Sequence, residues 1–260
     1  MNIRKITALL CALVLLFAAC GSEKEENRVD FGGDTAVSSG EAETGGETGS
    51  RPDGETASEE ALETFFSVEE YDYTGETDPD ILAYFGNDIG SALTRLAPSA
   101  KAVAYAAYCY PDDLAGEVTD EVVWCALYSM IDAFHQLPEG STTTEDGRVV
   151  IRGSDKLMRM AGDMFTAGVG TLSVPHEDFL DSLIYYDAAT DTYTFEPSGG
   201  EGLEIRICAL EAGEGDSMGL TVQLYNSIFD FTSWVSLRIT KNPASAYGYT
   251  VSGATAWNEE

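Results

Sequence analysis

Four segments near the end of the chain alternate apolar and polar residues, and this pattern limits the fold more than any other feature. Successive residues of an extended strand point to opposite faces, so alternation predicts a strand with one apolar face. The apolar positions are Leu203, Ile205 and Ile207; Leu220, Val222 and Leu224; Val235, Leu237 and Ile239; and Tyr247, Tyr249 and Val251. Four such strands in succession predict an antiparallel meander with one buried and one solvated face.

Helical spacing dominates the residues before these strands. The clearest helix is predicted over 119–137, with Thr119 or Asp120 as its N-cap. A second is predicted over 153–168, beginning at a Ser154 cap and ending at Gly168. Their apolar stripes are Val123, Leu127, Met130, Ile131 and Phe134, and Leu157, Met160, Ala161, Met164 and Phe165. Shorter helices, interrupted by Gly and Pro, are predicted over 58–66, 78–96 and 98–110.

Together these elements predict a single α+β domain over residues 59–260. Its 202 residues are enough for a substantial core. A strand at 148–152 and a hairpin formed by the segments IYYD and TYTF lie between the two halves. We expect the N-terminal helices to pack on one face of the C-terminal antiparallel β-meander, which gives a two-layer domain. Cystatin-like and NTF2-like folds have this layout.

The first twenty residues have the three parts of an export signal. Arg4 and Lys5 form a positive head, residues 6–19 are mostly apolar, and small residues precede Cys20. Fourteen apolar residues are fewer than the ~20 that a membrane-spanning helix needs. The segment Phe17-Ala18-Ala19-Cys20 resembles the lipobox of bacterial lipoproteins, although that family usually has Leu where this chain has Phe17.

The resemblance implies that residues 1–19 are a signal peptide that is removed and that the Cys20 thiol is acylated and becomes the new N-terminus. The alternative is ordinary secretion with a coincidental cysteine; an A-x-A cleavage site before Cys20 would need a small residue in place of Phe17. Two or three acyl chains on Cys20 would suffice for stable anchoring, because each buried CH₂ contributes ~0.8 kcal/mol.

Residues 20–58 read as an acidic tether that follows the lipidated cysteine. Gly, Ser, Thr and Glu dominate it, so it cannot bury enough apolar surface to offset the entropy of ordering. The 38 residues after Cys20 would span about 35 Å as a flexible coil. The order of signal, tether, helices and meander also resembles small lipoproteins of Gram-positive bacteria. That resemblance implies a place on the outer face of the cytoplasmic membrane.

The charge is strongly acidic. The whole chain has a formal net charge of −31, and residues 59–260 contain 35 acidic and nine basic residues, a net −26. Nucleic acid binding is excluded because phosphate neutralisation needs clustered Lys and Arg. Anionic lipid and wall polymers would be repelled, and cationic polypeptides would be attracted. Solubility outside the cell explains the same charge without any partner.

Cys11 would be removed with the signal peptide and Cys20 would be lipidated, which leaves three cysteines in the predicted domain. Cys109, Cys125 and Cys208 form neither a C-x-x-C motif nor an even set, so no disulfide framework is predicted. A single bridge between Cys109 and Cys125 stays open; otherwise these are buried apolar residues.

One motif suggests catalysis. The segment GDSMG at 215–219 matches the serine-nucleophile elbow G-x-S-x-G, which requires a strand, a sharp turn and a helix. Here Ser217 stands between two alternating strands, and no histidine follows His176. The order of His135 or His176, then Asp181, then Ser217 would suit a chymotrypsin-like triad, but both histidines lie in helical segments. We therefore predict a hairpin turn at Ser217.

No metal or cofactor site is predicted. The two histidines are 41 positions apart; His135 suits a helix C-terminus and His176 a first helical turn. Two groups of acids supply oxygen ligands suited to calcium, but neither has the spacing of a calcium loop. They are Asp187 with Asp191, and Asp72 with Glu76, Asp78 and Asp80. Turn and helix-cap roles are the prediction for these acids.

The leading hypothesis is therefore a lipid-anchored extracytoplasmic protein with a non-enzymatic binding or interaction domain. Its contact surface would be the solvated face of the meander or the aromatics Tyr185, Tyr186 and Tyr193. The first alternative is an envelope hydrolase or wall-modifying enzyme that uses carboxylates distant in the sequence. The second is an accessory subunit of an envelope complex, whose acidic surface docks a basic partner.

Overall fold

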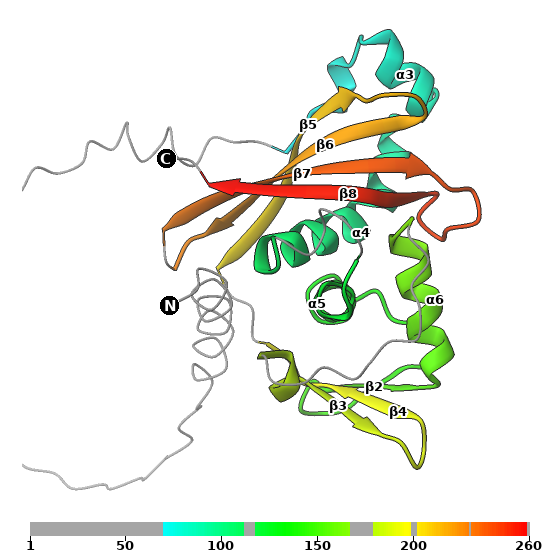
Figure 1. Ribbon diagram of the computed structural model, residues 1–260, viewed down its shortest axis with the longest axis vertical. Coiled ribbons are helices and arrows are strands. Elements are labelled where there is room, and N and C mark those ends of the chain that lie inside the picture. Colours follow the sequence, from blue (N-terminus) through cyan, green and yellow to red (C-terminus); the bar gives the residue numbers. More distant parts are fainter. Residues whose placement is uncertain (1–69, 112–117, 167–178, 199–201, 229, 259–260) are drawn as a thin grey trace, which may run out of the picture. The chain divides into compact units, whose positions relative to one another are not determined.

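The C-terminal strands form one antiparallel sheet in the order β5-β6-β7-β8, which confirms the predicted meander and the α+β class. The strands are β5 (Leu203–Ala212), β6 (Ser217–Asn226), β7 (Phe231–Lys241) and β8 (Tyr249–Asn258). The computed structural model describes residues 70–111, 118–166, 179–198, 202–228 and 230–258. Their helices pack on the apolar face of this sheet, as expected (Figure 1).

Two strands of the meander carry a β-bulge that changes which residues face the core. On β5, Ile207 and Ala209 pair with consecutive residues of β6, so Cys208 is the extra residue. On β8, Val251 and Gly253 pair with consecutive residues of β7, so Ser252 is the extra residue. Beyond each bulge the alternation of faces is reversed, because the side-chain period of a strand is two.

Helix α4 (Ile89–Cys109) crosses the buried face of the meander (Figure 1). It runs without a break through Pro98, so the prediction of two helices separated at this proline is wrong. Proline removes one intrahelical hydrogen bond, but Leu96 and Ala100 on either side are fully buried. Tertiary packing therefore outweighs the local preference. Asp88 caps the helix by accepting a hydrogen bond from the Ser91 N–H at 3.0 Å.

Helix α5 (Asp120–Asp132) is buried around its whole circumference rather than along one stripe. Every residue from 122 to 131 is buried. Thr119 is its N-cap, one of the two predicted candidates, and accepts from the Val122 N–H at 3.5 Å. A helix that is apolar all round needs cover on every side. Helix α4 supplies it on one side, and a second sheet supplies it on the other.

The second sheet has the strand order β1-β2-β4-β3 and is antiparallel throughout. Its strands are β1 (Thr142–Thr143), β2 (Val149–Arg152), β3 (Ile184–Asp187) and β4 (Thr192–Phe195). Trp124 of α5 lies against Tyr193 with ring centroids 5.4 Å apart, and Tyr128 lies 6.5 Å from Phe195. The domain thus has three layers, with α4 and α5 between two sheets (Figure 1), where the sequence predicted two.

Two further helices complete the described elements: α3 (Pro79–Phe85) and α6 (Ser154–Met164). The apolar stripe predicted for α6 is buried. The predicted Ser154 cap is wrong, since Asp191 of the β3–β4 turn accepts the Ser154 N–H at 2.9 Å. The helix ends at Met164, and Gly168 lies outside the described residues. No helix in the described ranges has both the length and the hydrophobicity needed to cross a bilayer.

Candidate functional site

Cys20, the predicted lipid anchor, lies outside the described residues. The signal peptide, the tether at 21–58, the helix predicted at 58–66 and His176 also lie outside them. Acylation of Cys20 therefore stays a prediction from the lipobox. The site that can be built from the structure is the one that the tethered domain would present to a partner.

Ser217 is the first residue of β6 and belongs to a hairpin turn, as predicted. Its hydroxyl donates to the Glu214 carbonyl at 2.7 Å, and its own carbonyl accepts from the Gly213 N–H at 3.2 Å. Gly215 supplies the positive φ of 63° that the turn requires. The context is strand, turn and strand, so the nucleophile elbow that G-x-S-x-G requires is not formed.

The acids considered as calcium ligands lie in turns and at helix starts, the roles that the sequence predicted for them. Asp78 caps α3, and Asp72 accepts from the Thr74 N–H at 2.9 Å. Asp187 binds the Thr190 hydroxyl at 2.7 Å, which lowers its pKa, while the backbone N–H of Ser154 lowers the pKa of Asp191. No group of three or more metal-ligating side chains occurs in the described part of the chain.

Cys109, Cys125 and Cys208 form no disulfide in the described part of the chain. Cys109 and Cys125 are buried, as predicted, and form no bridge. Cys208 occupies the bulge of β5, where burial raises the pKa of its thiol. A raised pKa disfavours the reactive thiolate. His135 is exposed just beyond α5 with a φ of 51°.

Of the three tyrosines predicted to form a contact surface, two are exposed and Tyr193 is buried. Tyr185 and Tyr186 are 52% and 37% exposed on the edge strand β3, but Tyr193 is only 4% exposed. Tyr186 stacks on Tyr193 with centroids 4.4 Å apart and donates to Asp191 at 3.1 Å. Only Tyr185 therefore presents a freely exposed ring, which is a small contact surface.

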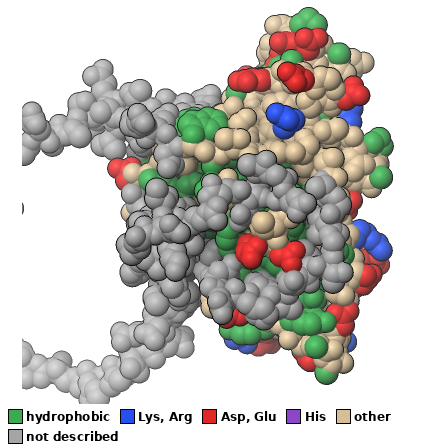
Figure 2. Space-filling view, in the orientation of Figure 1, with side chains coloured by type: hydrophobic (Ala, Val, Ile, Leu, Met, Phe, Trp, Pro, Cys, Tyr) green, Lys and Arg blue, Asp and Glu red, His purple; other side chains and the backbone are tan. Residues whose placement is uncertain are grey.

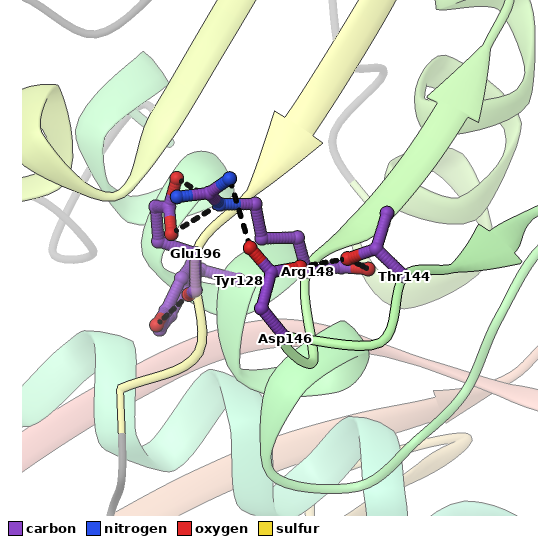
Figure 3. Close-up of polar contacts among 5 residues, drawn as sticks. All are labelled: Tyr128, Thr144, Asp146, Arg148 and Glu196. Atoms are coloured by element: carbon purple, nitrogen blue, oxygen red, sulfur yellow. Dashed lines mark hydrogen bonds and ion pairs between the residues drawn. The ribbon is translucent and has the colours of Figure 1, made fainter. Parts of the chain in front are cut away.

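A polar network lies where β2 begins and β4 ends (Figure 3). Arg148 binds the Glu196 carboxylate through Nε at 2.7–2.8 Å and Asp146 through Nη1 at 2.9 Å. Tyr128 of α5 donates to the Glu196 carbonyl at 2.7 Å, and burial raises its pKa. Thr144 bonds to Asp146 and lowers its pKa. The network has one positive and two negative charges, all three engaged in ion pairs, and the bond from Tyr128 joins it to α5.

The solvated face of the meander carries a row of large side chains across all four strands. Arg206 pairs with Gln223, Gln223 with Trp234, and Trp234 with Trp257. Residues directly opposite in an antiparallel pair share a face, with Cβ atoms about 4.5–5.5 Å apart. Of this row only Trp257 is exposed, at 42%; Arg206 and Trp234 are half-buried and Gln223 is buried, and the indole N–H of Trp234 has no partner among the described residues.

This row depends on the bulge at Ser252. Tyr249 and Val251 face the core, so uninterrupted alternation would turn Trp257 inward as well. The bulge reverses the phase, so Ala254 and Ala256 pack on the core and Trp257 faces outward. Sequence reasoning missed both tryptophans; the position of Trp234 between core-facing residues was the only available signal.

The same face is acidic at the end formed by the β5–β6 hairpin. A shallow hollow of about 970 Å³ lies there, with Glu211, Glu214 and Asp216 among its lining residues and Arg238 as its one basic residue among those described. At the other end Arg206 is paired with Glu204. The face thus combines an aromatic row with an acidic margin.

No known family model, curated protein or solved structure matches this chain.

Proposed function

We propose that the protein is a lipid-anchored extracytoplasmic binding protein, without enzymatic activity, that holds a basic polypeptide of the cell envelope on the outer face of its meander. The observation that carries the proposal is the row from Arg206 to Trp257. Trp, Tyr and Arg are the residues that most often dominate the energy of protein interfaces.

The acidic margin indicates the chemistry of the partner. Glu211, Glu214 and Asp216 lie on the hairpin that borders the face, in a domain of net charge −26. Such a field attracts cationic polypeptides and speeds their encounter. Acylated Cys20 and a tether of about 35 Å would let the domain reach partners beside the membrane.

The hydrolase hypothesis gains no support from the described carboxyl groups. Where the pKa of a described aspartate clearly departs from its ordinary value, it is lowered, as at Asp146, Asp187 and Asp191. A general acid working near neutral pH needs a raised carboxyl pKa. The hypothesis of an accessory subunit is compatible with the proposed surface, because a basic partner in a complex would bind it in the same way.

A pull-down from envelope extracts tests the proposal with full-length protein in detergent. Trp257→Ala should abolish recovery of a basic partner, and raised salt should weaken it. Tyr185→Ala is the matched control, an exposed aromatic on the other sheet. Retained binding by Trp257→Ala, or loss with Tyr185→Ala alone, would refute the assignment. Cys20→Ser should release the protein from membranes while leaving its capture of the partner unchanged.

A further inference from the structure

A cleft of about 830 Å³ lies away from the meander's outer face, between α4, α6, the segment after α5 and the β7–β8 connection. Three of its lining residues are basic: Arg95 on α4, and Lys156 and Arg159 on α6. Figure 2 shows basic side chains gathered on the surface at the level of α6, beside acidic ones. The cleft is open to solvent and has room for a small organic molecule.

This gathering is unusual because the domain has only nine basic residues, and one third of them line one cleft. Four have partners elsewhere: Lys101 with Glu70, Arg148 with Asp146 and Glu196, Arg206 with Glu204, and Lys241 over the ring of Tyr84. Arg152 and Arg238 lie outside the cleft. The guanidinium groups of Arg95 and Arg159 make no ion pair or hydrogen bond with a described residue, which is also true of Arg152 and Arg238; what distinguishes Arg95 and Arg159 is that they line the same cleft.

The cleft is lined by three acids as well as three bases, but none of the acids forms an ion pair with Arg95 or Arg159. Asp163 accepts a hydrogen bond from the Ala246 N–H at 3.2 Å, and Asp155 lies in the first turn of α6 against Gly153. Glu139 is exposed and contributes its backbone carbonyl, which Lys156 Nζ binds at 2.8 Å. Lys156 is thereby held in place at the rim, and the two arginines are left to face the cleft.

Tyr247 adds a neutral donor to the same lining. Its side chain is only 9% exposed, and its hydroxyl makes no hydrogen bond with any described residue. The hydroxyl is not among the described buried polar atoms that lack a partner, so it is open to the solvent of the cleft. Burial and then the charge of Asp163 raise the pKa of Tyr247 to about 12, so its O–H stays available as a donor at neutral pH.

We propose that this cleft binds a small soluble organic phosphate, with Arg95 and Arg159 as its charged donors and Tyr247 as its neutral one. The planar fork of arginine matches two phosphate oxygens at once, and charge-assisted bonds of this kind are the strongest in proteins. The field of a domain at −26 opposes all anions and opposes long polyanions most strongly, so among phosphates a small one is the better candidate. The inference is independent of the proposed function, since none of these residues lies on the aromatic row.

Titration calorimetry on full-length protein in detergent tests this, with inorganic phosphate and glycerol 3-phosphate as probes. We expect both to bind and the double variant Arg95→Gln/Arg159→Gln to weaken binding at least about tenfold. Arg152→Gln/Arg238→Gln is the matched control, because it removes the same charge from outside the cleft and should leave binding unchanged. Tyr247→Phe should weaken binding by a smaller factor, and Arg159→Lys should weaken it although the charge is kept.

Three results would overturn the proposal: no heat with either phosphate, equal losses in the cleft and control variants, or citrate binding as tightly as glycerol 3-phosphate. Flotation with phosphatidylglycerol vesicles, using a Cys20→Ser protein, separates soluble from lipid phosphate. Arginine-dependent flotation would reject a soluble ligand. If the double variant does not fold, the single variant Arg159→Gln is measured instead, because Arg159 is exposed and its replacement should not affect folding. Unchanged phosphate binding by Arg159→Gln would count against the site.

Discussion

Phe195→Ala tests whether the second sheet is part of one cooperative core. Phe195 is 1% exposed on β4, between Val149 of β2 and Ile184 of β3, and its ring lies 6.5 Å from that of Tyr128 on α5. Removing a buried phenyl ring costs about 3–5 kcal/mol, from lost burial and the cavity left behind. For a domain of this size 1 kcal/mol corresponds to about 2–4 °C in Tm. The expected fall is therefore about 6–20 °C.

Thermal unfolding followed by circular dichroism in the far and near ultraviolet measures this fall. Tyr185→Ala is the matched control, an aromatic residue 52% exposed on the neighbouring strand, which should change stability by no more than about 0.5 kcal/mol. A single transition at lower temperature in both spectra supports the three-layer core. The reasoning is refuted if the main transition keeps its wild-type Tm, or if the two variants lose the same stability.

Two further predictions concern tyrosines. Tyr128→Phe removes the donor to the Glu196 carbonyl and should lower the free energy of unfolding in urea by about 1–3 kcal/mol, whereas Tyr185→Phe should leave it unchanged. If the Tyr128 variant is as stable as the wild type, this bond does not hold the layers together. The pKa of Tyr247 rises from 10.0 to about 12, so the folded state keeps its proton where the unfolded state loses it. Its contribution is complete below pH 10 and is lost between pH 10 and 12. A Tyr247→Phe protein should lose less stability across that window, and identical alkaline curves would contradict the assignment.

The alternation of apolar and polar residues predicted the meander correctly, because it depends only on local geometry: successive residues of a strand point to opposite faces of the sheet. It cannot predict a bulge, because the extra residue is an ordinary amino acid that nothing in the pattern of apolar and polar residues marks out. Ser252 shows the consequence: one unpaired residue moves Trp257 from the core face to the solvated face. The strands could be predicted from the sequence, but the aromatic row could not.

The second sheet, which forms the third layer, could have been expected from the sequence of α5, because that helix is apolar on all sides and not along one stripe only. Between Val122 and Ile131 the only non-apolar residue is Ser129, which bonds to the Cys125 carbonyl at 2.9 Å. A helix with so little polar surface cannot lie at the edge of a two-layer domain. The start of α6 was predicted wrongly for a different reason. Ser154 suits a cap locally, but Gly153 is the N-cap residue, and Asp191, 37 positions away, accepts the N–H of Ser154 in the folded chain.

The cleft shows most clearly what depends on tertiary structure. The sequence counts nine basic residues against 35 acidic ones, from which solubility or a basic partner follows equally well. It cannot show which bases are neutralised, because the decisive pairs join residues as far apart as Arg148 and Glu196. Arg95 and Arg159 are 64 positions apart and meet only when α6 packs beside α4. Four described arginines make no ion pair or hydrogen bond through their guanidinium groups, but only Arg95 and Arg159 line one cleft together. With the Tyr247 hydroxyl beside them, they form the set of donors that an anion from outside the chain would bind.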